Sequence, residues 1–205
     1  MKKILSLILM MLMLVSLAAC GSDTGADSNA EGKADTRIVV DHDGVEVELP
    51  LEVERIVVCD ILPLPSVLSV FFDSADKIVG MSSTSMSAAA NGLLGELYPD
   101  ILDAETGFID GSTVSVEELV KLAPDVVFYN ASRKELGQQL RSAGFPAVAV
   151  SVNKWEYDCI ETLNQWAALL GEIFKNAGKR THVVGNIGYP YSAAGFDSAD
   201  GDMFV

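Results

Sequence analysis

The sequence feature that most constrains the fold is residues 111–130, which predict a helix, a stop and a buried strand. Ser115 with Glu118 three residues later forms a capping box, in which each residue satisfies a backbone amide at the start of a helix. Pro124 cannot continue a helix and disfavours the helical conformation of the residue before it. The apolar run at 126–128 is typical of strands that parallel sheets bury on both faces. One apolar helix face is predicted by the spacing of Val116, Leu119, Val120 and Ala123.

A second helix and strand follow the same pattern. Ser132 with Glu135 predicts another capping box, and Gly144 predicts a helix C-cap. Pro146 then separates the helix from a predicted strand at 147–150. The apolar stripe of this helix consists of Leu136 and Leu140.

Two earlier strands are predicted at 56–59 and 77–80. Four strands separated by helices predict an α/β fold, with a parallel sheet, helices on both faces and right-handed connections. The helix after the first strand has an apolar face made of Leu64, Val67, Leu68, Phe71 and Phe72.

A β-hairpin is predicted at 37–50, where two alternating runs flank Asp43-Gly44, a favoured hairpin turn. We expect this hairpin at the edge of the domain. His42 lies between two aspartates in the turn, and we expect it to be solvated rather than bound to a metal.

The longest helical pattern spans residues 155–175. Trp155 and Trp166 could form an aromatic ligand box, but their spacing favours packing in the core and between lobes. Cys59 falls in a strand pattern and Cys159 in a helix pattern, so we expect both to be buried and apolar in character. One face of this helix carries Ile160, Leu163, Ala167, Leu170 and Phe174.

The start of the chain has the features of an export signal. Two lysines precede an apolar run at 4–19, which is short for a membrane-spanning helix and typical of a signal-peptide core. Cys20 follows Leu-Ala-Ala, as in the bacterial lipobox, so we expect residues 1–20 to be a lipoprotein signal peptide and Cys20 to carry the lipid. An ordinary signal peptide or an uncleaved anchor is the alternative. Residues 21–36 lack apolar periodicity and predict a disordered tether.

The segment VSVEELVKLAPDVVFY resembles a signature of the substrate-binding proteins of ABC importers for iron complexes, namely siderophores, haem and corrinoids. The resemblance covers about residues 37–178, with three further segments in register. It implies an N-terminal α/β ligand-binding lobe at 37–153 and a long interlobe helix at 154–177. It also implies a transported iron or cobalt chelate instead of a resident cofactor, ABC permease subunits as partners, and no enzymatic activity.

Candidate ligand-binding residues lie in the loops that follow predicted strands, where open α/β sheets bind ligands. The hydroxyls after the strand 77–80 could donate hydrogen bonds to a ligand, or could simply cap a helix. Phe108 could stack on a planar ligand or fill the core. The resemblance implies that the two residues after the strand at 126–128, Asn130 and Ala131, face the cleft. The full candidate set is Asp60, Ile61, Leu62, Pro63, Met81, Ser82, Ser83, Thr84, Ser85, Phe108, Asn130 and Ala131.

Composition excludes some functions. The chain has 205 residues, 49% of them hydrophobic, enough for one good core and part of a second. A net charge of −15 argues against binding nucleic acid and against lying flat on anionic lipid. An extracellular α/β enzyme, such as a hydrolase, is an alternative, but the sequence has no G-x-S-x-G elbow. With only His42 and His182, a histidine-rich metal site is also disfavoured.

The chain departs from the family pattern after the long helix. A second α/β lobe needs about 100 residues. Residues 178–205 resemble only the first strand and loop of such a lobe, with the strand at 181–187. We therefore expect a truncated or split member, with 178–205 a remnant of the second lobe. A remnant that binds no ligand is a further alternative function.

Overall fold

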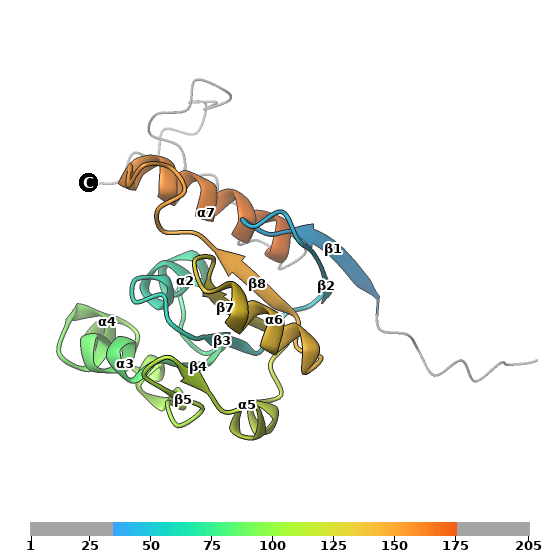
Figure 1. Cartoon of the computed structure of the whole chain (residues 1–205). Helices are drawn as coiled ribbons and strands as arrows, with labels where there is room; N and C mark the ends of the chain where they lie inside the picture. Colours follow the sequence, from blue (N-terminus) through green and yellow to red (C-terminus); the bar gives the residue numbers. More distant parts are fainter. Residues whose placement is uncertain (1–34, 176–205) are drawn as a thin grey trace, which may run out of the picture. The chain divides into compact units, whose positions relative to one another are not determined.

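The computed structural model describes residues 35–175. The predicted signal peptide with Cys20, nearly all of the tether, and the predicted remnant 178–205 lie outside the described residues. The centre of the fold is a four-stranded, fully parallel sheet in the order β4-β3-β7-β8 (Figure 1). This sheet confirms the predicted fold class. Its strands are β3 Ile56–Val58, β4 Ile78–Met81, β7 Val126–Asn130 and β8 Ala147–Val150.

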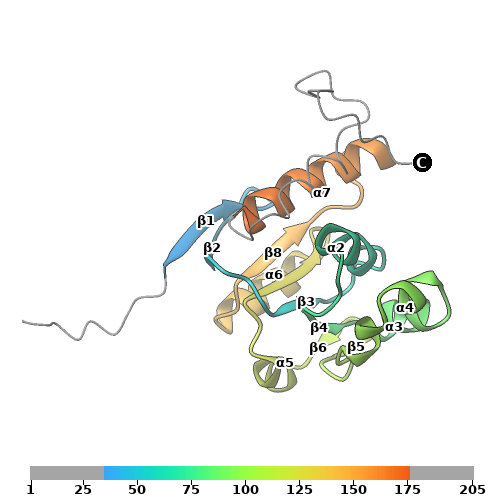
Figure 2. The same ribbon diagram turned by 180° about the vertical axis from the view of Figure 1, so that it is seen from behind.

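Helices cover both faces of this sheet, as Figures 1 and 2 show from opposite sides. One face packs against α2 and α7, and the other packs against α5 and α6. Successive residues of a strand point to opposite faces, so Val58 joins the first cluster and Val57 joins the second. The four helices are α2 Leu64–Phe72, α5 Val116–Leu122, α6 Lys134–Ser142 and α7 Cys159–Phe174.

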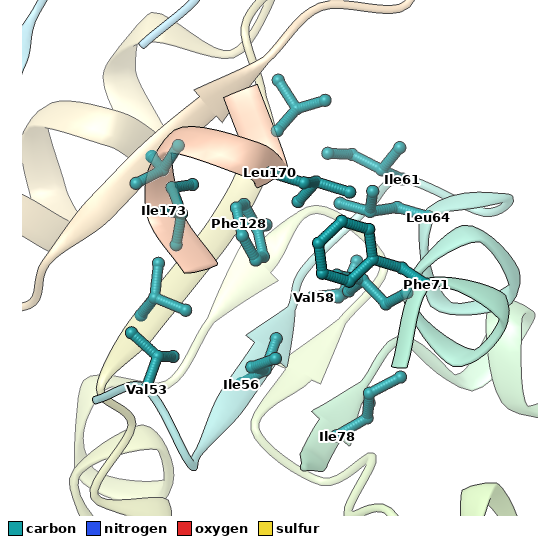
Figure 3. Close-up of a cluster of buried hydrophobic side chains, with 14 of the residues drawn as sticks. Val53, Ile56, Val58, Ile61, Leu64, Phe71, Ile78, Phe128, Leu170 and Ile173 are labelled. Atoms are coloured by element: carbon teal, nitrogen blue, oxygen red, sulfur yellow. The ribbon is translucent and has the colours of Figure 1, made fainter. Parts of the chain in front are cut away.

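The larger cluster lies between the sheet and the helices α2 and α7 (Figure 3). Ile56, Val58 and Phe128 meet Phe71 and Leu170 there, and all five side chains are buried. Burying a large apolar side chain contributes about 1.5–3 kcal/mol. This cluster therefore fixes the sheet against α7, whose C-terminal half supplies most of the helix's buried residues.

The predicted hairpin is confirmed as β1 Thr36–Val40 and β2 Glu46–Pro50, paired antiparallel with Val39 opposite Val47. Gly44 adopts a φ of 79° in the turn, which glycine reaches without strain. A second, unpredicted hairpin joins β5 Ile109–Asp110 to β6 Thr113–Val114.

The helix α5 is capped differently from the prediction. Ser115 accepts a hydrogen bond from the Glu118 amide, as expected. The Ser115 amide, however, donates to the Phe108 carbonyl, and the Glu118 carboxylate pairs with Lys121 instead of closing the capping box. The predicted face is also rotated, because Leu119 is buried whereas Val120 is 58% exposed.

The helix α6 begins at Lys134, after Arg133, which gives it no side-chain cap. The predicted capping box at Ser132 is therefore wrong, because Ser132 binds the Asn130 side chain instead. The buried stripe of Leu136 and Leu140 is confirmed. Gly144 follows the helix with a φ of 87°, as its predicted C-cap role requires.

The helix α7 begins at Cys159, later than the predicted start at 155. Glu156 and Tyr157 have φ values of 53° and 61°, which break the helical path, and Asp158 then caps α7 by accepting hydrogen bonds from two amides. Cys159 is exposed, so the expectation that it is buried is wrong. In the predicted apolar face, Ile160 and Leu163 are exposed, whereas Ala167, Leu170 and Phe174 are buried.

Two side chains that were predicted to be buried, Trp166 and Cys59, are buried. Trp166 is buried and its indole donates to the Ser151 carbonyl at 2.6 Å, in keeping with core packing. Cys59 is buried, as predicted.

Within residues 35–175, no helix is both long enough and apolar enough to cross a membrane. The remaining elements, between β4 and β5, are α3 Ser83–Ala90, α4 Leu93–Leu97 and the 3₁₀ helix η2 Pro99–Asp103.

Candidate functional site at the carboxyl edge of the sheet

The loops that leave the four parallel strands meet at one edge of the sheet, which we call the carboxyl edge. Parallel strands all end on the same side, and open α/β sheets bind ligands there. The carboxyl edge consists of residues 59–63, 82–85, 130–133 and 151–158, which follow β3, β4, β7 and β8 in that order. Most of the predicted site residues lie in the first three of these loops.

Asp60 is the polar centre of the carboxyl edge. Its carboxylate accepts a hydrogen bond from the Asn130 amide at 2.9 Å and pairs with the Arg133 guanidinium at 2.7 Å. The two side chains are only 16% and 26% exposed, so solvent screens the pair less than a surface ion pair. Arg133 also donates to the Ser112 carbonyl in the turn between β5 and β6. One ion pair thus ties together the loop after β3, the loop after β7 and the second hairpin.

Asn130 and Ala131 lie where β7 ends beside β8. The Asn130 side-chain oxygen accepts hydrogen bonds from the Ser132 amide and hydroxyl at 3.0 and 2.9 Å, which fixes the turn into α6. The Ala131 amide donates to the Val150 carbonyl, and the Ala131 side chain is buried. Asn130 is half-buried and is therefore the more accessible of the two.

The hydroxyl residues after β4 divide into two pairs. Ser82 caps α3 by accepting a hydrogen bond from the Ser85 amide, and the two hydroxyls lie 3.0 Å apart. Helix capping, one of the two roles considered for this loop, is thus observed for Ser82. Ser85 is buried, whereas Ser83 and Thr84 are exposed. Within residues 35–175, no side-chain hydrogen bond or ion pair joins Ser83 or Thr84 to another element.

Three candidate side chains lie in the core instead of on the surface of the edge. Ile61, Met81 and Phe108 are each 1% exposed or less. Met81 is the last residue of β4, and its amide donates to the Glu105 carbonyl, so it belongs to the sheet and not to the loop after it. Phe108 fills the core cluster beside α5. Leu62 and Pro63 are exposed and form the apolar part of the edge.

Arg133 and the loop after β8 were absent from the sequence-based set. A usable signal existed for Arg133, because Asp60 and Arg133 carry opposite charges in loops that leave parallel strands. Beside the loop after β8, a hollow of about 600 Å³ is lined by Lys154, Trp155 and Tyr157, among others. Tyr157 is 74% exposed there.

The chemistry of the carboxyl edge is that of hydrogen bonding and apolar contact. Burial, followed by the nearby Asp60 carboxylate, raises the pKa of the Cys59 thiol, whereas Arg133 acts in the opposite direction. The thiol therefore stays protonated and is a poor nucleophile. Among residues 35–175, no group of three or more His, Cys, Asp or Glu side chains is arranged to hold a metal ion.

Solved structures with a similar fold include periplasmic binding proteins. A periplasmic solute-binding protein from Veillonella parvula matches with a TM-score of 0.65 and 26% identity, over 74% of this chain and 44% of that chain. The molybdate-binding protein MolA of Haemophilus influenzae matches at 0.59 and 24%, over 74% of this chain and 49% of its own. The haem-binding protein HmuT matches at 0.51 and 21%, over 80% and 48%. This chain thus spans a little under half the length of each.

Sequence comparison finds a different resemblance. No protein-family model matches the chain. A UDP-N-acetylmuramoylalanine–D-glutamate ligase from Caldanaerobacter subterraneus is 31% identical over 113 residues, which are 55% of this chain and 23% of the enzyme. The corresponding ligase of Thermoanaerobacter pseudethanolicus is 53% identical over 38 residues, 18% of this chain and 8% of the enzyme. This chain spans less than a quarter of either ligase.

Proposed function

We propose that this chain is an extracytoplasmic solute-binding component of an ABC importer, which captures an iron complex and delivers it to the permease. The fold supports this proposal, since the structural neighbours named above are binding proteins and not enzymes. The observation that carries it is the carboxyl edge, where the loops that follow the four parallel strands lie and where the Asp60–Arg133 pair joins the loops after β3 and β7.

The accessible residues of the edge define the proposed contacts. We propose that Leu62 and Pro63 contact the apolar part of the ligand, while Ser83, Thr84 and Asn130 hydrogen-bond its polar rim. Asp60 and Arg133 hold these loops in place, because their ion pair joins two of them. The other candidates are buried, and we propose that they support the loops without contacting the ligand: Ile61, Met81, Ser85, Phe108 and Ala131.

The proposed ligand is a siderophore complex, haem or a corrinoid. The resemblance of residues 114–129 to the iron-complex binding proteins supports this class. Hydroxyl and amide groups beside exposed apolar side chains suit a chelate with a polar rim and an apolar surface. Residues 37–153 are proposed as one lobe of a two-lobed site.

Lipid attachment at Cys20 is part of the proposal and has its own test. Cells that express the full chain would be labelled with an alkyne-bearing fatty acid. We expect label on the wild-type chain and none on Cys20→Ala. Equal labelling of both chains would refute anchoring at Cys20.

Ligand capture is tested by thermal unfolding of the full chain with ferric siderophores, haem and cobalamin. A ligand at a hundred times its Kd adds about 2.7 kcal/mol of stability, a shift of several degrees. Leu62→Ala should weaken the shift, whereas Val120→Ala, an exposed valine on α5, should leave it unchanged. A cooperative transition that none of these complexes moves would reject the proposed ligand class and favour a chain that binds no ligand.

The ligase resemblance supports no second proposal. The longer match covers 23% of its enzyme and the shorter one 8%. The described residues fold like the binding proteins, and the carboxyl edge offers no group with the features of an activated nucleophile: the Cys59 thiol is buried and protonated.

A further inference from the structure

The turn of the first hairpin is bound to the outer edge of β8, the last strand of the sheet. The Asp41 carboxylate accepts a hydrogen bond from the Ala149 amide at 3.1 Å, and the His42 amide donates to the Ala149 carbonyl at 3.1 Å. The other carboxylate oxygen of Asp41 accepts from the amides of Asp43 and Val45. The turn thereby occupies backbone groups that an edge strand would otherwise leave unpaired.

The His42 ring makes the next contact along this edge. Its Nδ1 accepts a hydrogen bond from the Ser151 amide at 3.0 Å, and its Nε2 lies 3.4 Å from the Gln165 carbonyl oxygen on α7. The ring also packs edge-on against Trp155, with centroids 4.9 Å apart. His42 is therefore half-buried between the hairpin, the loop after β8 and α7, and the prediction of a solvated turn histidine is wrong.

These two contacts fix the protonation state of the ring. A backbone amide can only donate, so Nδ1 must be free of a proton, and a carbonyl can only accept, so Nε2 must carry the proton. The neutral ring satisfies both contacts in this one tautomer. A second proton on Nδ1 would point at the Ser151 amide hydrogen and break that bond.

Charged groups around the ring act in both directions. Burial is the largest influence and lowers the pKa of His42 below its usual 6.5. The Gln165 carbonyl, Asp41 and Asp43 act to raise this pKa, and the Lys154 ammonium acts to lower it. Lys154 also donates to the His42 carbonyl at 2.8 Å. On α7, Glu172 lines the same hollow of about 380 Å³ as His42, and Glu161 binds the Gln165 side chain.

We infer that His42 is an acid-sensitive latch, whose protonation separates the hairpin turn from Ser151 and the loop that leads into α7. The folded-state pKa lies below the value of about 6.5 expected in the open state, so the open state takes up the proton first. The latch is fully effective above pH ~6.5 and is lost as the pH falls through the folded-state pKa. This inference depends on the contacts of His42 and is independent of the proposed ligand.

The test is amide hydrogen exchange of the full chain, followed by NMR and corrected for the intrinsic pH dependence of exchange. Protection of the Ser151 and Ala149 amides should fall by up to about tenfold per pH unit between pH ~6.5 and the folded-state pKa of His42, and should level off below that pKa. The Val127 amide, which donates to Pro146 inside the sheet, serves as the internal reference and should keep its protection. Parallel loss at Val127 would show general unfolding and overturn the latch.

Two variants separate His42 from other titrating groups. His42→Asn offers a side-chain oxygen near the position of Nδ1 and does not titrate, so protection of Ser151 should become independent of pH. His182→Asn removes the other histidine of the chain and should behave as the wild type. Unchanged pH dependence in His42→Asn would overturn the inference.

Ring NMR of the wild-type chain gives a second readout that needs no variant. We expect the His42 signal to show the neutral tautomer with the proton on Nε2 and to titrate below 6.5. A proton on Nδ1 at neutral pH, or titration above 6.5, would contradict the latch even if His42→Asn fails to fold.

Discussion

At the scale of single residues, Tyr129 on β7 packs directly against Gly137 on α6. Tyr129 is fully buried, and its hydroxyl accepts a hydrogen bond from Arg141 at 2.9 Å. Burial raises the pKa of the Tyr129 hydroxyl, with Arg141 acting in the opposite direction. A Cβ on Gly137 would lie 2.3 Å from the tyrosine oxygen. Glycine is therefore required by packing in the middle of a helix, where alanine normally stabilises.

Gly137→Ala should destabilise the chain. Alanine in an exposed helix gains about 0.5–1 kcal/mol over glycine, but overpacking a core costs about 1–3 kcal/mol, so we expect the sign to reverse. The measurement is denaturant unfolding of both chains. Gly107→Ala is the matched control, because its Cβ would meet nothing within 4 Å, and its stability should change little. A more stable Gly137→Ala chain would show that the tyrosine does not fill this space.

Asp60→Ala should lower the free energy of unfolding by about 1–3 kcal/mol, since it removes the partner of two donors, the Asn130 amide and the Arg133 guanidinium. The control is Glu118→Ala, which breaks an ion pair with Lys121 whose side chains are 47% and 67% exposed. Exposed pairs contribute about 0–1 kcal/mol. Equal effects of the two changes in chemical denaturation would mean that the Asp60 pair does not organise the carboxyl edge.

The residues that sequence reasoning placed wrongly depend on contacts between distant segments. His42 was expected to be solvated because its neighbours are aspartates, yet Ser151 and Gln165 enclose it. Arg133 was overlooked although its charge is opposite to that of Asp60, because Asp60 is far away in the chain and the two loops were considered separately. Both positions are fixed by the order of the strands, which local patterns do not reveal.

At the scale of elements, the helix and strand of residues 116–130 were predicted well. Pro124 ends α5, and Ala123 takes a left-handed φ of 43° just before it. The four sheet strands and the buried stripe of α6 also follow from apolar patterns. Helix starts were less predictable. Ser132 does not cap α6, because its hydroxyl binds the Asn130 side chain. The start of α7 is set by the left-handed backbone at Glu156 and Tyr157.

Ser115→Ala should destabilise the chain by about 1 kcal/mol, because it removes the hydroxyl that caps α5. Ser132 has the same place in the second predicted capping box but caps no helix. Ser132→Ala should therefore cost clearly less in a parallel thermal unfolding experiment. If the two losses were equal, the assignment of Ser115 as the helix cap would be wrong.

At the scale of the whole molecule, residues 35–175 form one apolar cluster on each face of the parallel sheet, and the loops that follow the four strands lie at one edge of that sheet. The wall of the proposed site is thus built from loops, while the sheet and four helices hold it. The sequence predicted which loops would meet there, because parallel strands must end together. It could not predict which side chains stay accessible, and Met81 and Phe108 are in the core.

The most direct measurement is NMR mapping of the isotope-labelled full chain with the metal complex that shifts its melting temperature most, a ferric ligand being replaced by its diamagnetic gallium(III) analogue. We expect amide shifts concentrated at residues 60–62, 82–85 and 130–133, with the opposite edge at Glu54, Arg55 and Asp125 unchanged. Asp125 holds the first two amides there at 2.8 Å, so these signals are well-ordered references. Shifts confined to the opposite edge, or no saturable shift with any siderophore complex, haem or corrinoid, would contradict the proposed site.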